Sequence, residues 1–255
     1  MPTVRFDSPS QRAKIALARE YGDRVKALSY SYNEEVERVW KKYMPSLRLA
    51  MQMGQDVEHI LDAIISDMRA LLVILIQDAA DLAVEREVDN DADRLFFGLI
   101  PLEVEQCNMG YYEDALGRYR EILELDLIIA KELGFADDLE MFLYNPLAFL
   151  AGDTEGLIRL KNEVPAGQGV SYSFFENMKK IGISAAALSY TNALYHIWEK
   201  GGEVLYYYGV RNSNYPCALC DGEAYMLHRM DEGMIYPLHN RCVCSVIPLR
   251  QSDMS

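Results

Sequence analysis

The sequence predicts a mainly α protein, a bundle of long helices with a small β-containing module at the C-terminus. Three observations support this fold class. Apolar residues recur every three or four positions over long stretches, as they do along one face of a helix. After two consecutive glycines the chain reads "VLYYYGV", a run of high β propensity. Four of the five cysteines then fall between Cys217 and Cys244. We expect a helical domain over 1–200 and the small module over 201–255.

Two long helices are predicted in the first part of the chain. The first begins at Ser8 and Pro9, which supply a capping hydroxyl and a preset φ, and is expected to end at Pro45. Gly22 is the weak point of its apolar face. The second runs over about 56–87, and its middle, "ALLVILI", is apolar on all sides. This segment is therefore expected to be buried between other helices.

Two more helices follow. One is predicted over about 111–133 and stops at Gly134, a residue suited to a helix end. The other is predicted over about 174–200. Between them lies a stretch near 145–172 that is rich in Gly and Pro, which indicates a connector.

Charge and composition exclude several functions. The formal net charge is −14, so most of the surface repels phosphate and is a poor nucleic-acid partner. The sequence leaves room only for a weak, salt-sensitive contact with DNA, made by Arg211, Arg229 and Arg241. The start of the sequence lacks a secretory pattern, which favours a reducing cytoplasm and argues against disulfides. No apolar run approaches the length of a membrane span, so no membrane partner is expected.

The cysteines and one histidine are spaced like metal ligands. Cys217 and Cys220 form a CxxC, a spacing at which two thiolates converge on one ion. Cys242 and Cys244 precede "SVIP", a predicted strand, so their sulfurs should share a face. These four cysteines are the favoured set. His239 could replace one of the last two thiols, so five candidates compete for four tetrahedral positions.

The spacing predicts a structural zinc ion in a treble-clef-like module. A module of this size cannot bury a real core, and a metal would supply the missing folding free energy. A site closed by four protein ligands leaves no position for a catalytic water. The alternatives are a disulfide pair or idle buried thiols. Cys107, far from the others, is expected to be a small buried apolar residue.

At these residues the sequence resembles a known family. "CALCDGEAY" followed by "YPLHNRCVCSVIP" is similar to the closing signature of the phage head morphogenesis proteins, the minor head proteins related to phage Mu F. The positions that match are Cys217, Cys220, Gly222, Pro237, His239, Cys242, Cys244 and Pro248. The likeness covers about the last eighty residues, and the helices before them carry no signature.

The resemblance implies a structural role in the virion. Family members are virion components present in a few copies per particle, that is, in multiple copies but low number. They are bound inside the head near the portal vertex. They act in head assembly or in DNA packaging and ejection. The implied partners are portal or capsid proteins, with a possible weak contact with packaged DNA. Such a protein is made in the cytoplasm of the host bacterium, and no enzymatic activity is expected.

An enzyme is the alternative hypothesis. "HN" at His239 and Asn240, beside a CxxC, could belong to a small zinc-containing nuclease of the His-Asn-His type. Such nucleases need a helix with a second metal-binding histidine after the motif. Here a predicted strand follows instead, and no histidine comes after His239.

Overall fold

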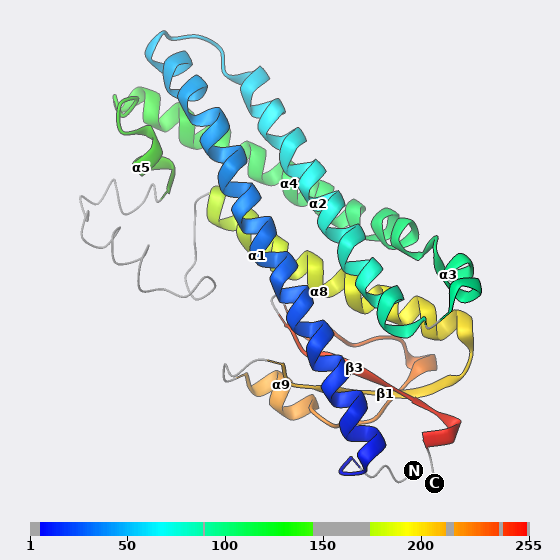
Figure 1. The fold of residues 1–255 in the computed structure, drawn as a ribbon. Helices are drawn as coiled ribbons and strands as arrows, with labels where there is room; N and C mark the ends of the chain where they lie inside the picture. The colour runs from blue at the N-terminus through cyan, green and yellow to red at the C-terminus, as the bar shows by residue number, and fades with distance from the viewer. Residues whose placement is uncertain (1–5, 89, 145–173, 213–216, 240–241, 254–255) are drawn as a thin grey trace. The chain divides into compact units, whose positions relative to one another are not determined.

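A computed structural model describes residues 6–88, 90–144, 174–212, 217–239 and 242–253 of the 255-residue chain. Its helices and strands confirm the predicted class, mainly α with a small sheet near the C-terminus (Figure 1). The elements are α1 (Pro9–Gln52), α2 (Glu58–Glu87), α3 (Asp91–Phe97), α4 (Ile100–Glu132), α5 (Leu139–Tyr144), α8 (Phe174–Gly201), β1 (Val204–Val210), α9 (Ala218–Glu223), β2 (His228–Arg229) and β3 (Ser245–Arg250). The predicted connector near 145–172 lies outside the described residues.

The chain divides into two compact units, and each long helix contributes a stretch to both. The sheet unit comprises Met1–Tyr30, Ile74–Asn108 and Ile183–Ser255, and the helical unit comprises Ser31–Val73 and Met109–Gly182. The C-terminal segment therefore belongs to the same compact unit as parts of the long helices. Whether 201–255 is a separate domain stays a prediction.

The first helix is longer than the sequence predicts. We expected it to end at Pro45, and this was wrong, because α1 continues to Gln52. A proline inside a helix removes one backbone hydrogen bond and costs about 3 kcal/mol. Met44, Leu47 and Met51 are buried around and beyond it, and burying each such side chain contributes roughly 1.5–3 kcal/mol. Packing of the last two turns thus outweighs the local break.

The apolar middle of α2 is not buried on all sides, which corrects a second expectation. Leu72, Leu75 and Ile76 are buried, but Ala70 is exposed and Ile74 is 54% exposed. Ala70 and Ile74 are four residues apart, so they share one face of the helix. Over the described ranges, no helix has both the length and the apolarity to cross a bilayer.

Aromatic packing fills the helical unit. Trp40 of α1 lies against Phe174 and Phe175 at the start of α8, with ring centroids 6.1 and 5.8 Å away. Further along α8, a Cβ at Gly182 would overlap the ring of Tyr32. The two helices therefore approach closely only because position 182 has no side chain.

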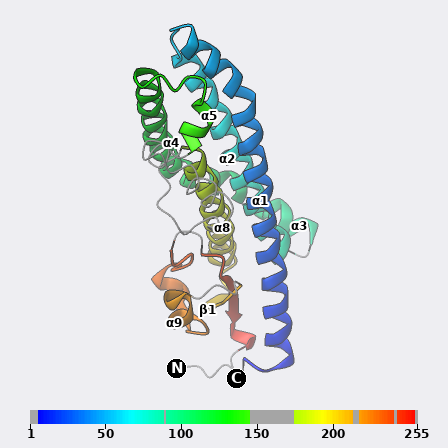
Figure 2. The same cartoon turned by 90° about the vertical axis from the view of Figure 1, so that its left-hand side faces the viewer.

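Strand β1 is the centre of the sheet. The order is β2-β1-β3, and both neighbours pair with β1 antiparallel. Figure 2 shows the first part of α1 on one side of the strands and α9 on the other. Tyr208 and Val210 of β1 pack with Ile247 of β3 and Ala18 of α1. Gly22 explains the close approach of α1, because a Cβ there would overlap the side chains of Asn212 and Ser245.

A buried arginine joins α2 to α8 and to the sheet. The side chain of Arg86 is 2% exposed. It donates to the Tyr190 hydroxyl of α8 at 3.0 Å and to the Val246 carbonyl of β3 at 2.8 Å. Its Nε lies 3.2 Å from the carboxylate of Glu87, whose side chain is 6% exposed. Groups from three elements therefore surround the buried charge, and its Nε contributes to the ion pair without a hydrogen bond among the described residues.

We predict that Arg86→Ala lowers the free energy of unfolding by about 3–5 kcal/mol, because it breaks the buried ion pair with Glu87 and removes the donor to Tyr190 and Val246. The matched control is Arg24→Ala, which removes an arginine paired with Glu85 at 2.7 Å where both side chains are more than 40% exposed. Screening by water limits that loss to about 1 kcal/mol. Urea denaturation of both variants checks the difference, and equal losses would contradict the buried role of Arg86.

A second prediction concerns Asp126 on α4 in the helical unit. It is 9% exposed, and its Oδ2 has no hydrogen-bond partner among the described residues. Burial raises the pKa of this carboxyl from 3.8 to about 6. The folded state thus binds the proton more tightly than the unfolded state. Stability is lost as the pH rises from about 4 to 6, and the loss stays in full above that range.

Asp126→Asn is expected to stabilise the protein at pH 8 by up to about 3 kcal/mol, and the gain should shrink toward zero near pH 4. Thermal unfolding measured between pH 4 and 8 checks this. Asp114→Asn on the same helix, at an exposed position, is the matched control and should show a smaller dependence. A gain that does not change with pH would exclude ionisation of Asp126 as the cause.

Candidate metal centre

The CxxC lies at the start of a short helix. Cys217 is the N-cap residue of α9, and Cys220 lies in the first turn. The Asp221 N–H donates to the Cys217 carbonyl at 2.9 Å, which closes this turn. Cys220 is buried and Cys217 is half-buried. The first turn of α9 therefore places the sulfurs of Cys217 and Cys220 on the same side of the helix.

The second half of the cluster comes from the segment before β3. The Cys242 N–H donates to the His239 carbonyl at 2.9 Å. Cys242 is buried and Cys244 is half-buried, directly ahead of the first residue of β3. This half of the cluster therefore offers one imidazole and two thiols.

The structure brings all five predicted residues together. The His239 Nε2 lies 3.1 Å from the Cys217 sulfur and 3.2 Å from the Cys220 sulfur. The sulfurs of Cys220 and Cys242 are 3.7 Å apart. The ligand atoms form two groups of three, each within 4.8 Å: Cys217, Cys220 and His239, and Cys220, Cys242 and Cys244. Cys220 belongs to both groups, so it is the centre of a cluster that could hold a metal ion.

The thiols differ in acidity because their surroundings differ. Burial raises the pKa of Cys220 to about 12. A hydrogen bond with Cys244 lowers the pKa of Cys242 to about 5. Metal ligation requires thiolates, so an ion bound here would displace the protons that remain. All five cysteines of the chain are free thiols, so no disulfide blocks such ligation.

Strand β1 supports both halves of the cluster. The Tyr207 hydroxyl donates to the Gly233 carbonyl at 2.8 Å and accepts from the Ile235 N–H at 3.0 Å, in the segment that leads to His239. Tyr236 donates to the Glu223 carbonyl at the end of α9 at 3.1 Å. Neither cysteine motif points to Tyr236 as a support of the site.

Gly209 of β1 is required by the same arrangement. A Cβ at this position would overlap the hydroxyl and ring of Tyr236. The Gly209 carbonyl also accepts from the Tyr225 N–H at 2.9 Å, just beyond α9. A glycine inside a predicted strand is a sign of such close approach, and it was the one available signal in the sequence.

The arginines considered for DNA contact are already paired. Arg211 forms an ion pair with Asp221. Arg229 forms one with Asp231 at 2.5 Å. Their charges are therefore largely neutralised within the module. Arg241 and Asn240 lie outside the described residues.

Cys107 corrects one expectation. It was predicted to be buried, but it is exposed on α4, because its neighbours Asn108 and Met109 occupy the inward face at that turn. It lies in neither group of potential ligands. This residue is therefore a natural control for thiol chemistry at the cluster.

Comparisons of the chain with protein-family models, with curated proteins and with solved structures find no match. The geometry of the described residues is thus the whole basis for what the cluster can do. Three facts define it: soft sulfur ligands, one imidazole nitrogen, and burial of the central thiol. Together they define a site able to bind a metal ion.

We predict that the purified, reduced protein carries about one metal ion per chain by elemental analysis, as a single tetrahedral site would. Cys220→Ala should lose it, because this sulfur belongs to both groups. Of the replacements at Cys217, His239, Cys242 and Cys244, those that remove a ligand should lose the metal, and one that retains it identifies the spare residue. Cys107→Ala, the matched thiol control, should retain it. Metal-free reduced protein would contradict the site.

Proposed function

We propose that the chain is a minor head protein of a bacteriophage, a structural virion component that docks at the portal or the inner capsid. The observation that carries the proposal is the convergence of the signature residues. Cys217, Cys220, His239, Cys242 and Cys244 are those by which the sequence resembles head morphogenesis proteins, and their ligand atoms meet in one cluster. The residues that carry the resemblance therefore lie close together in space.

We propose zinc as the metal. Tetrahedral coordination with zinc–sulfur bonds of about 2.3 Å places two sulfurs roughly 3.8 Å apart. The Cys220 and Cys242 sulfurs, at 3.7 Å, fit that separation. Thiolates with an imidazole are also a ligand set that suits zinc. The bound ion would supply folding free energy to the C-terminal segment.

A structural role for the metal follows from the number of ligands. Five candidate side chains are available for four positions, so protein atoms can close the coordination sphere. A closed sphere leaves no place for a reactive water. The zinc would then connect α9 to the segment before β3. Tyr207 of β1 holds the segment that leads to His239, and Tyr236 of that segment holds the end of α9.

The nuclease alternative is weaker on the same geometry. A catalytic histidine needs a ring nitrogen free to take a proton from water. The Nε2 of His239 instead lies 3.1 and 3.2 Å from two sulfurs, which suits a metal ligand. Strand β3 follows the motif, where a nuclease of this type would have a helix.

The partners proposed are the portal and capsid proteins, inside the head near the portal vertex, with multiple copies per particle. The protein would be made in the cytoplasm of the host bacterium and would assist head assembly or DNA packaging and ejection. The net charge of −14 favours docking on protein over binding along DNA. Any contact with packaged DNA would be weak, since Arg211 and Arg229 are paired with acids.

The expected outcome of a binding experiment is co-sedimentation of the purified protein with portal rings of the same phage. Mass spectrometry of purified particles should find the chain in multiple copies. Cys220→Ala is expected to reduce incorporation at least several-fold through loss of the metal, as removing a ligand from a structural site unfolds small modules. Cys107→Ala, the matched control, should be incorporated as wild type.

Absence of the chain from purified particles would refute the structural proposal. Incubation with plasmid DNA and Mg²⁺ tests the enzyme alternative directly. Cleavage that is abolished by His239→Ala, in protein that still folds, would replace the structural proposal with the nuclease.

A further inference from the structure

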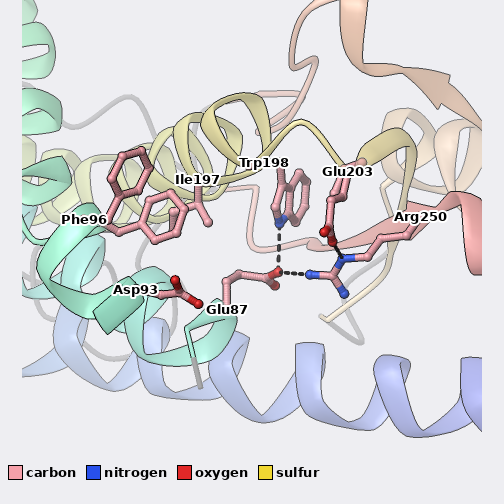
Figure 3. A pocket seen from close by; sticks show the side chains of 10 residues that line it. Glu87, Asp93, Phe96, Ile197, Trp198, Glu203 and Arg250 are labelled. Atoms are coloured by element: carbon pink, nitrogen blue, oxygen red, sulfur yellow. Dashed lines mark hydrogen bonds and ion pairs between the residues drawn. The ribbon is translucent and has the colours of Figure 1, made fainter. Parts of the chain in front are cut away.

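A cavity of about 320 Å³ lies in the sheet unit, and no residue of the cysteine cluster lines it. The end of α2, α3, the end of α8 and the strands β1 and β3 all contribute to its wall (Figure 3). The volume is near the lower end of the range of about 300–1,000 Å³ for small-molecule pockets. It suits one long side chain better than a nucleotide or a large cofactor.

The wall carries an excess of negative charge. Glu87, Asp93 and Glu203 contribute three carboxylates, whereas Arg250 is the one guanidinium in the lining. Arg250 is held by acids on both sides, at 3.6 Å from Glu87 and 3.5 Å from Glu203. Arg86 also lies 3.2 Å from Glu87, so two guanidinium groups face three carboxylates. One net negative charge remains, and its field favours a cation.

Aromatic rings form the rest of the wall. Phe96 and Phe97 of α3 and Trp198 of α8 line the cavity. Trp198 is fixed in place, because its Nε1 donates to the Glu87 carboxylate at 2.9 Å (Figure 3). The face of an aromatic ring attracts a cation, and a planar guanidinium can also stack on it.

Exposed apolar side chains lie next in sequence to the lining residues Phe96 and Phe97. Leu95 is 85% exposed, Phe96 is 64% exposed, and Leu99 is 63% exposed. All three lie on α3 or directly after it. Exposed apolar groups gathered on a short segment mark a surface that another protein covers.

We propose that this cavity binds the side chain of an arginine from a partner protein, in a segment where apolar residues flank the arginine. The Asp93 and Glu203 carboxylates would accept hydrogen bonds from the guanidinium, the rings would stack on it, and the apolar neighbours would cover Leu95 and Leu99. Arginine fits better than lysine because its planar group both stacks and donates in a fork. This binding is independent of any role in a virion.

The test uses the peptide acetyl-Leu-Arg-Leu-amide and the same peptide with citrulline, which keeps the shape of arginine but has no charge. Binding is followed by the NMR signal of the Trp198 indole N–H, and Trp40→Phe separates it from that of the other tryptophan. The arginine peptide should shift this signal at millimolar concentration. The citrulline peptide should bind about tenfold or more weakly, because charge-assisted hydrogen bonds are lost.

Variants at exposed positions test the cavity without unfolding the protein. Glu203→Gln, whose side chain is 78% exposed, and Phe96→Ala should each weaken binding several-fold. Glu199→Gln is the matched control: it removes an equal charge from an exposed position on α8 outside the cavity lining, and it should leave binding unchanged. Equal affinity for the citrulline peptide, or no shift of the Trp198 signal, would overturn the proposal.

Discussion

The buried guanidinium of Arg86 is the constraint on which the sheet unit depends. A charged side chain that is only 2% exposed needs a counter-charge and hydrogen-bond acceptors within the protein. The partners of Arg86 come from α8 and β3 as well as from its own helix. If α8 or β3 moved away from α2 in this unit, the Arg86 guanidinium would lose partners while still buried.

The network of contacts around Arg86 continues to the cavity wall. Glu87, the neighbour of Arg86, accepts from Trp198 and lies near Arg250 of β3. Arg250 in turn lies near Glu203, which precedes β1. The proposed arginine site is thus built on a network that also holds the fold. The charged side chains of the cavity wall are therefore fixed in position, since moving Trp198 or Arg250 would disturb the buried pair of Arg86 and Glu87.

Strand β1 connects the network to the metal centre. It pairs with both other strands of its sheet, and Tyr207 and Gly209 contact the segments that carry the cysteines. Tyr208 of the same strand faces α1, where its hydroxyl donates to Gln11 at 2.9 Å. Adjacent side chains of a strand point to opposite faces, so one strand serves the metal centre and the helical layer at once.

The sequence by itself determined the features that depend on local patterns, namely the helices and the group of potential metal ligands. Helical periodicity predicted the long helices, Gly134 marked the end of α4, and the spacing from Cys217 to Cys244 predicted which residues would meet. Tertiary structure decided what depends on distant partners. Packing carried α1 past Pro45, and one face of α2 at Ile74 stayed exposed because no described element covers it. The partners of Arg86 and the cavity wall come from segments far apart in the chain, and no local pattern records which segments will meet.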